Sequence, residues 1–172
     1  MRKKRCENGF SIIELLIALA ISAMLLVAVA VAFSASMMSY RQNEDIFKAV
    51  NSARQALFRI KTQLRTATAV DPNSPANECS FITAGGDNIT YRFNSGDGKL
   101  YLITNDDLTD SDYVLCDNVA AVTFSRTTRT RTEEGVTYTY VSRVDMSMTV
   151  VVGDAQRMVS SAAVIRRNLY MY

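Results

Sequence analysis

The sequence predicts an α+β protein in which one long N-terminal helix packs on antiparallel β-sheet. Three observations support this fold class. From Leu15 to Phe33, 19 consecutive residues carry no charge. From Ile46 to Ala67, apolar residues recur at alternating steps of four and three, which is the spacing of one helix face. From Cys79 onward, apolar and polar residues alternate with the period of two that is typical of strands.

The uncharged run has the length of a membrane-spanning helix. About 20 apolar residues cross a bilayer, whereas the apolar core of a secretory signal peptide has about 7–15. No proline or glycine occurs between Phe10 and Asp71, so nothing in this stretch breaks a helix. We therefore expect one helix over residues 11–70, with a transmembrane part at 10–33 and an amphipathic continuation at 34–70.

The amphipathic continuation carries one apolar stripe on an otherwise polar helix. The stripe consists of Ile46, Val50, Ala53, Leu57, Ile60, Leu64 and Ala67. Such a stripe forms either the seam of a coiled coil or a face that docks on a sheet. Only about three heptads are present and a strand-rich region follows, so docking on a sheet is the expectation. Proline and turn-forming residues at 71–75 should end the helix.

Residues 71–172 should form a β-rich domain. Ile89, Tyr91 and Phe93 alternate with polar residues, and glycines at 96 and 98 then turn the chain into an expected hairpin. The expected strands are 89–93, 99–104, 119–125, 136–143, 144–152 and 158–166. A helix packed on one face of antiparallel sheet is a stable two-layer arrangement.

The charge is unevenly distributed along the 172 residues. The net charge is +2, with 19 basic and 17 acidic side chains. The first nine residues hold four of the basic residues and one acidic residue, so they carry +3, and the remainder, with 15 basic and 16 acidic residues, carries −1. A nearly neutral body gives no general argument for nucleic-acid binding.

The sequence contains no histidine, which removes many enzyme classes. Neither a Ser-His-Asp nor a Cys-His arrangement is possible, and metal sites with imidazole ligands are excluded. We expect a non-enzymatic protein without a cofactor.

The N-terminal segment combines a basic start, Gly9, Phe10 and then Glu14 at the head of the apolar run. A carboxylate near an apolar span is unfavourable, at roughly 2.5–3.5 kcal/mol at the centre of a membrane helix and less near the interface. Glu14 could lie at the headgroup level, where the positive end of the helix dipole stabilises it. This position explains Glu14 alone. A further explanation is needed for the whole combination, which consists of the basic leader, Gly9, Phe10, Glu14 and the unbroken apolar run.

This combination resembles the signal of type IV prepilins and of the related pseudopilins of type II secretion, over about residues 5–33. The resemblance implies that a prepilin peptidase cuts between Gly9 and Phe10 and that Phe10 becomes an N-methylated N-terminus. It also implies that Glu14 pairs with the N-terminal amine of a neighbouring subunit during filament assembly. A long helix followed by antiparallel strands is the pilin architecture, so the rest of the chain agrees with the signal.

The resemblance also bears on location and subunit type. The basic leader should stay in the cytoplasm by the positive-inside rule, which leaves the C-terminal domain in the periplasm after a single span of the inner membrane. The span lacks the proline that is common in major pilins, and residues 163–169 resemble the ends of minor pilins of the W type and of the J pseudopilin. We expect a minor pilin or pseudopilin that helps to initiate a filament. An ordinary single-span protein that is never processed is an alternative.

Cys79 and Cys116 lie in the expected periplasmic domain, where oxidising conditions favour one disulfide between them. The alternative is two unpaired, half-buried thiols.

Asp106, Asp107, Asp110 and Asp112 place four carboxylates within seven residues. Calcium takes oxygen ligands of this kind, but the spacing is not that of an EF-hand. A solvated acidic loop is the expectation, and no metal site is predicted.

Arg126, Arg129 and Arg131 alternate with threonines before Glu133 and Glu134. They could bind phosphate in a DNA-uptake or adhesive minor pilin, or form an exposed loop whose arginines pair with the glutamates. No aromatic residue on which bases could stack lies between the arginines. Nucleic acid is therefore not the expected partner.

Overall fold

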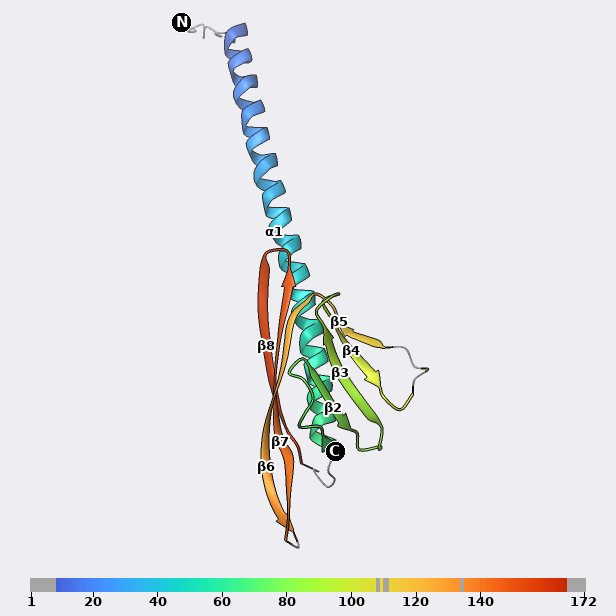
Figure 1. Ribbon diagram of the computed structural model, residues 1–172. Helices are drawn as coiled ribbons and strands as arrows, with labels where there is room; N and C mark the ends of the chain where they lie inside the picture. The colour runs from blue at the N-terminus through green and yellow to red at the C-terminus, as the bar shows by residue number, and fades with distance from the viewer. Residues whose placement is uncertain (1–8, 108, 110–111, 134, 167–172) are drawn as a thin grey trace, which may run out of the picture. The chain divides into compact units, whose positions relative to one another are not determined.

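The computed structural model describes residues 9–107, 109, 112–133 and 135–166. The chain divides into two compact units, one ending at Arg41 and the other beginning at Gln42. The helix α1 spans Ile12–Thr66, and all the strands belong to the second unit (Figure 1). A long N-terminal helix followed by antiparallel sheet confirms the predicted α+β class.

The first unit is the apolar part of α1. Every described residue up to Arg41 is exposed in this single chain. The exposed side chains include Phe10, Leu16, Leu26 and Phe33. The helix contains a window long and apolar enough to cross a membrane, and none of that window is buried within the chain. Its apolar surface is therefore available to lipid or to other proteins.

The second part of α1 supplies one layer of the core. Its buried residues are Ala49, Ala53, Ala56, Leu57, Ile60 and Leu64. They follow the predicted stripe, whose first members Ile46 and Val50 are partly buried against the same core. The prediction that the stripe docks on sheet is confirmed. The small alanine side chains allow the helix backbone to approach the strands closely.

The helix ends four residues before the predicted end at Val70. Ala69–Val70 forms the short strand β1 and pairs with Ile82 and Phe81 of the next strand. The Thr68 hydroxyl donates to the carbonyls of Ile82 and Thr83, both at 3.3 Å. The backbone thus obtains its hydrogen bonds from the sheet before the prolines are reached, and the sequence pattern of the helix does not reveal this.

The first sheet has five antiparallel strands in the order β1-β2-β3-β4-β5. After β1 its strands are β2 (Glu78–Ile82), β3 (Asn88–Asn94), β4 (Lys99–Thr104) and β5 (Tyr113–Cys116). The predicted hairpin is the β3–β4 pair, in which Phe93 lies opposite Leu100. Gly98 closes its turn with φ of 65°, a conformation that favours glycine.

The second sheet has three antiparallel strands, β6 (Val119–Glu133), β7 (Val136–Val152) and β8 (Ala155–Val164), in that order. Strands predicted separately at 136–143 and 144–152 are one strand. The change of pattern between them is a bulge, because Thr127 lies opposite Arg143 and Thr128 opposite Val141, which leaves Ser142 without an opposite residue. The bulge moves the alternation by one residue, and this explains why the sequence reads as two strands.

One hydrophobic core joins α1 and both sheets. The five-stranded sheet contributes Phe81, Tyr91 and Leu100, and the three-stranded sheet contributes Phe124, Met146 and Met148, among others. The rings of Phe81 and Tyr91 stack with centroids 5.9 Å apart. The second unit therefore folds around a shared interior rather than as two independent sheets.

Candidate functional site

The start of α1 carries the carboxylate half of a capping box. Gly9 and Phe10 precede the helix, and the Ser11 N–H donates a hydrogen bond of 3.2 Å to Oε2 of Glu14. Glu14 is thus the third residue of the helix, where a carboxylate satisfies a backbone N–H that has no partner within the helix. Ser11 was not among the predicted site residues, although the S-x-x-E spacing of Ser11 and Glu14 is the sequence signature of such a cap.

Glu14 has no charged neighbour in the apolar part of the sequence that follows it. It is the sole charged residue from Ile12 to Tyr40. It lies one turn from Phe10, whose side chain is 83% exposed. The carboxylate therefore sits next to the residue that would become the N-terminus if the chain were cut after Gly9. The capping bond uses one carboxylate oxygen, and a carboxylate has about four acceptor positions, so Glu14 can accept a further donor.

The predicted disulfide between Cys79 and Cys116 is wrong for this fold. Both residues are free and buried. Cys79 on β2 lies opposite Tyr91 on β3, and Cys116 on β5 lies opposite Leu100 on β4, so two strands separate them. Three strand spacings are about 14 Å, whereas disulfide-bonded Cα atoms lie within about 7 Å.

Both thiols have low reactivity at neutral pH. Burial raises the pKa of Cys79 to about 11, although the nearby Arg126 guanidinium acts in the opposite direction. Burial also raises the pKa of Cys116. A thiol reacts as its thiolate, so neither residue is an activated nucleophile at neutral pH.

Two carboxylates of the acidic loop accept hydrogen bonds from other groups of the chain. Oδ2 of Asp106 accepts from the Asn88 N–H at 2.7 Å, and Oδ1 of Asp107 accepts from the N–H and hydroxyl of Thr109. Asp112 is described, whereas Asp110 lies outside the described residues. Among the described residues no group of three or more acidic, cysteine or histidine side chains could hold a metal ion.

The three predicted arginines do not form one patch. Residues alternate faces along β6, so Arg126 lies on one face and Arg129 and Arg131 on the other. The predicted exposed loop is instead part of strand β6, which continues to Glu133. The side chain of Glu133 and all of Glu134 lie outside what the structure describes, so the predicted arginine–glutamate pairing stays a prediction.

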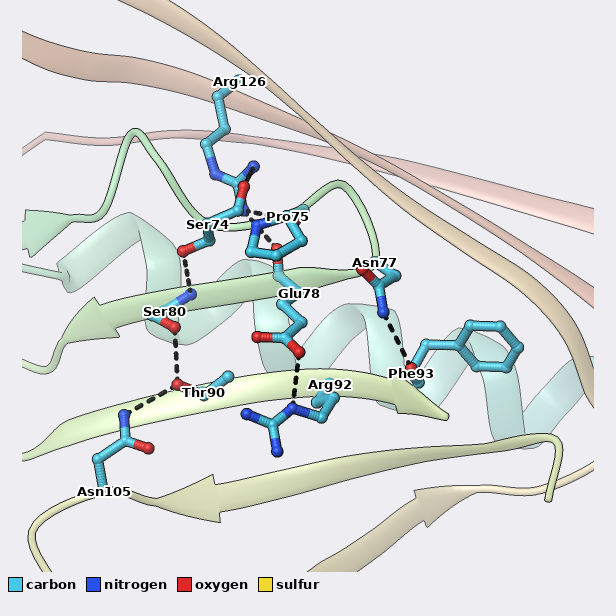
Figure 2. A network of polar contacts seen from close by, with 10 residues as sticks. All are labelled: Ser74, Pro75, Asn77, Glu78, Ser80, Thr90, Arg92, Phe93, Asn105 and Arg126. Atoms are coloured by element: carbon cyan, nitrogen blue, oxygen red, sulfur yellow. Dashed lines mark hydrogen bonds and ion pairs between the residues drawn. The ribbon is translucent and has the colours of Figure 1, made fainter. Parts of the chain in front are cut away.

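Arg126 connects the two sheets (Figure 2). Its guanidinium donates to the backbone carbonyl of Ser74 at 2.9 Å, to that of Pro75 at 3.4 Å and to that of Glu78. The Phe124 N–H adds a backbone bond of 2.7 Å to the Ala76 carbonyl. A planar guanidinium with five donors is suited to gather several carbonyls. Arg126 therefore holds β6 against the segment that follows α1.

Polar side chains continue this network across the five-stranded sheet (Figure 2). The buried Thr90 hydroxyl is bonded to the Ser80 hydroxyl at 2.7 Å and accepts from Nδ2 of Asn105 at 2.8 Å. Glu78 and Arg92 form an ion pair of 2.7 Å on the same sheet. These groups satisfy one another, as buried polar groups generally do, so the network stabilises the fold.

Residues 4–30 match the family model of the prokaryotic N-terminal methylation motif. No curated protein and no solved structure matches the chain. The matched residues include Gly9, Phe10 and Glu14 and most of the uncovered apolar helix. The predicted resemblance to a type IV pilin-like prepilin signal is therefore confirmed.

Proposed function

We propose, from the premise that this chain carries a type IV pilin-like prepilin signal, that it is a minor pilin or pseudopilin. It is a structural, non-enzymatic subunit of a type IV pilus or of a type II secretion filament. One observation carries the proposal: the motif leads directly into an apolar helical segment that no described residue covers and in which, from Ile12 to Tyr40, Glu14 is the single charge. The α+β fold of the second unit agrees with it.

Processing occurs between Gly9 and Phe10. Both residues precede α1 and are exposed, and a Cβ on Gly9 would meet no heavy atom within 4 Å. Because Gly9 lies outside the helix and has no side chain, the backbone at this position can enter the narrow site of a peptidase. Prepilin peptidase is then the first partner, and Phe10 becomes the methylated N-terminus.

Assembly uses the Glu14 carboxylate. Cleavage creates an amine at Phe10, and a carboxylate and an ammonium group that are each unfavourable in lipid become tolerable as a pair. The amine of a neighbouring subunit can approach Glu14 while the carboxylate keeps its capping bond to Ser11. The exposed apolar residues of α1 pack against other pilin subunits in the filament.

The location follows from charge and hydropathy. The leader carries Arg2, Lys3, Lys4 and Arg5 on the N-terminal side of the apolar helix. The positive-inside rule keeps these residues in the cytoplasm. The chain then crosses the inner membrane once, and its C-terminal domain lies in the periplasm until the subunit enters the filament.

A minor component is favoured over the abundant subunit. The span contains no proline, since Pro72 is the first in the chain. The ending at 163–169 also supports this assignment, as far as it is described: Ile165 is buried in the core, and residues 167–169 lie outside the described part. As a minor component, the subunit contributes to filament initiation.

The N-terminus of the mature chain tests the proposal. Mass spectrometry of the protein from cells with a prepilin peptidase should show a chain nine residues shorter that begins with methylated Phe10. Gly9→Leu should leave the full-length precursor, whereas Ser22→Ala, a matched small change within the span, should be processed normally. An intact Met1, or an unmodified cut elsewhere in the native chain, would instead favour an ordinary single-span protein that prepilin peptidase does not process.

A further inference from the structure

Strand β8 is an edge strand of the three-stranded sheet. It lies beside β7 and pairs with it along its whole length without a bulge (Figure 1). The other edge strand, β6, is bonded to the segment before β2, because the Phe124 N–H donates to the Ala76 carbonyl. β8 contains no proline, and its one charged residue is Arg157. It therefore lacks most of the features by which edge strands avoid pairing with another chain.

Alternate residues of β8 have backbone groups that point away from β7. The Ile165 N–H, directly after the strand, donates to the Ser142 carbonyl of β7 at 3.0 Å. Hydrogen-bonded and non-hydrogen-bonded pairs alternate in an antiparallel ladder, so the odd-numbered residues of β8 bond to β7 and the even-numbered ones point outward. Among the described residues, no hydrogen bond reaches the outward N–H and C=O groups of Met158, Ser160 and Ala162.

A groove of about 170 Å³ lies between β8 and the second part of α1. Its lining includes Arg54, Phe58 and Lys61 from the helix and Val159 and Ser160 from the strand. The three helix residues follow one another at steps of four and three, so they share one face. The Phe58 side chain is 70% exposed. The groove thus places an apolar ring and two long basic side chains beside unpaired backbone groups.

Both sides of the groove are basic. The stretch of α1 from residue 47 to residue 66 contains no acidic residue, and neither does β8. The basic residues of this stretch are Lys48, Arg54, Arg59, Lys61 and Arg65. Lys48 is paired with Glu44 at 2.7 Å, and the Arg59 guanidinium lies over the Tyr113 ring. Within the described chain no acidic side chain balances Arg54, Lys61 or Arg65.

This charge determines which chain can pair with the open edge. A second copy of β8 would carry the same basic helix beside it, and like charges brought together in this way oppose pairing. An acidic segment is instead attracted by Arg54 and Lys61. A nucleic acid or an anionic lipid is also attracted, but neither offers the regularly spaced N–H and C=O groups that the edge can bond.

We infer that this groove binds an extended acidic segment of another protein, which adds to the sheet as a strand beside β8. Hydrogen bonds to the outward backbone groups supply affinity, and alternate side chains supply specificity. Acidic side chains on one face of the segment meet Arg54 and Lys61. Side chains on its other face cover Met158 and Val164, which are exposed on the outer face of the sheet. The inference goes beyond the proposed function and does not depend on cleavage after Gly9 or on filament assembly.

The test uses the full chain in uncharged detergent and a short fluorescent peptide of alternating glutamate and threonine, with binding followed by anisotropy. Ser160→Pro removes one outward N–H and should weaken binding about tenfold. The matched change Ser160→Ala keeps this N–H and should bind the peptide like the native chain. Proline is tolerated at a position of an edge strand whose N–H points away from the sheet, and circular dichroism verifies that the strands are retained.

The charges of the groove are tested by a second pair of variants. Arg54→Gln should weaken binding of the same peptide about threefold at low salt, and added salt should reduce this difference. Arg129→Gln removes an exposed arginine that does not line the groove, and it should leave the affinity unchanged.

The backbone of the peptide tests strand addition without any change to the protein. N-methylation of its backbone nitrogens keeps the glutamates and removes the donors, so it should weaken binding at least about tenfold. The unmethylated peptide should also slow hydrogen exchange at the outward N–H groups of Met158, Ser160 and Ala162.

Three outcomes would overturn the inference. They are no anisotropy change at low salt, equal affinities of the two peptides, and equal affinities of folded Ser160→Pro and Ser160→Ala. If the methylated peptide binds as well as the unmethylated one and an oligonucleotide or anionic lipid vesicles displace both, the groove is a general anion-binding surface and no strand is added. If Ser160→Pro does not fold, the comparison of the two peptides on the native chain decides.

Discussion

The Arg126 guanidinium donates a hydrogen bond of 2.9 Å to the carbonyl of Ser74, a residue 52 positions earlier in the chain. This contact ties the three-stranded sheet to the segment between α1 and β2. Its further bonds to the carbonyls of Pro75 and Glu78 make one side chain responsible for three backbone acceptors. Hydrogen bonds from a charged donor to partly buried carbonyls, as at Ser74 and Glu78, are worth more than an exposed ion pair.

Replacing this arginine should therefore destabilise the domain. We expect Arg126→Met to lower the free energy of unfolding by about 2 kcal/mol, because the carbonyls lose their donor while the aliphatic volume is kept. Urea denaturation of the full chain in detergent measures the change. Arg129→Met, at an exposed position, should cost about 0.5 kcal/mol or less. Equal losses in the two variants would show that the contacts of Arg126 contribute no stability.

The capping bond of Glu14 can be separated experimentally from the charge that the proposed assembly requires. Glu14→Gln removes the charge and retains an oxygen that can accept from the Ser11 N–H, whereas Glu14→Ala removes both. Both variants should be processed normally, and both should be depleted from purified filaments if assembly needs the carboxylate. Quantitative blotting of the membrane and filament fractions measures this. Normal incorporation of Glu14→Gln would reduce the role of Glu14 to capping.

The separation of the cysteines predicts their redox state. Because two strands lie between Cys79 and Cys116, tryptic digestion without reductant should give no peptide pair linked through them. Both thiols should be alkylated quickly in urea and slowly in the native chain. A linked pair recovered from protein isolated from cells would mean that the order of the strands in the five-stranded sheet is different.

Stability should decrease in alkaline solution. Burial raises the pKa of Cys79 from 9.0 to about 11 and that of Tyr91 from 10.0 to about 12. A raised pKa means that the folded state retains a proton that the unfolded state loses, so stability is full below about pH 9 and declines as pH rises through the folded values. Cys79 alone should account for about 1.4 kcal/mol at pH 10.

The contribution of Cys79 is measured by urea denaturation at pH 8 and pH 10. Cys79→Ala lacks the titrating group, so its loss of stability between the two pH values should be smaller than that of the native chain. An equal loss in both proteins would assign the alkaline effect to other groups.

Local sequence patterns were sufficient to predict the helix and much of the β-structure. The stripe from Ile46 to Ala67 predicted the buried helix face because a helix repeats every 3.6 residues whatever packs on it. In the same way, the alternation of apolar and polar residues predicted the β3–β4 hairpin and β8. The helix end was predicted four residues late, because the hydrogen bonds of Ala69–Val70 come from a strand further along the chain. The bulge at Ser142 made one strand read as two.

The sequence by itself determined the prepilin signal, the apolar helix and the fold class, since each depends on the order and spacing of neighbouring residues. Only the tertiary structure decided which distant residues meet. It separated Cys79 from Cys116, assigned Arg126 to the junction of the sheets, and placed Tyr138 and Tyr140 opposite Arg131 and Arg129. The physical reason is that strand order and register are set by contacts between segments far apart in the chain, and spacing within one segment carries no record of them.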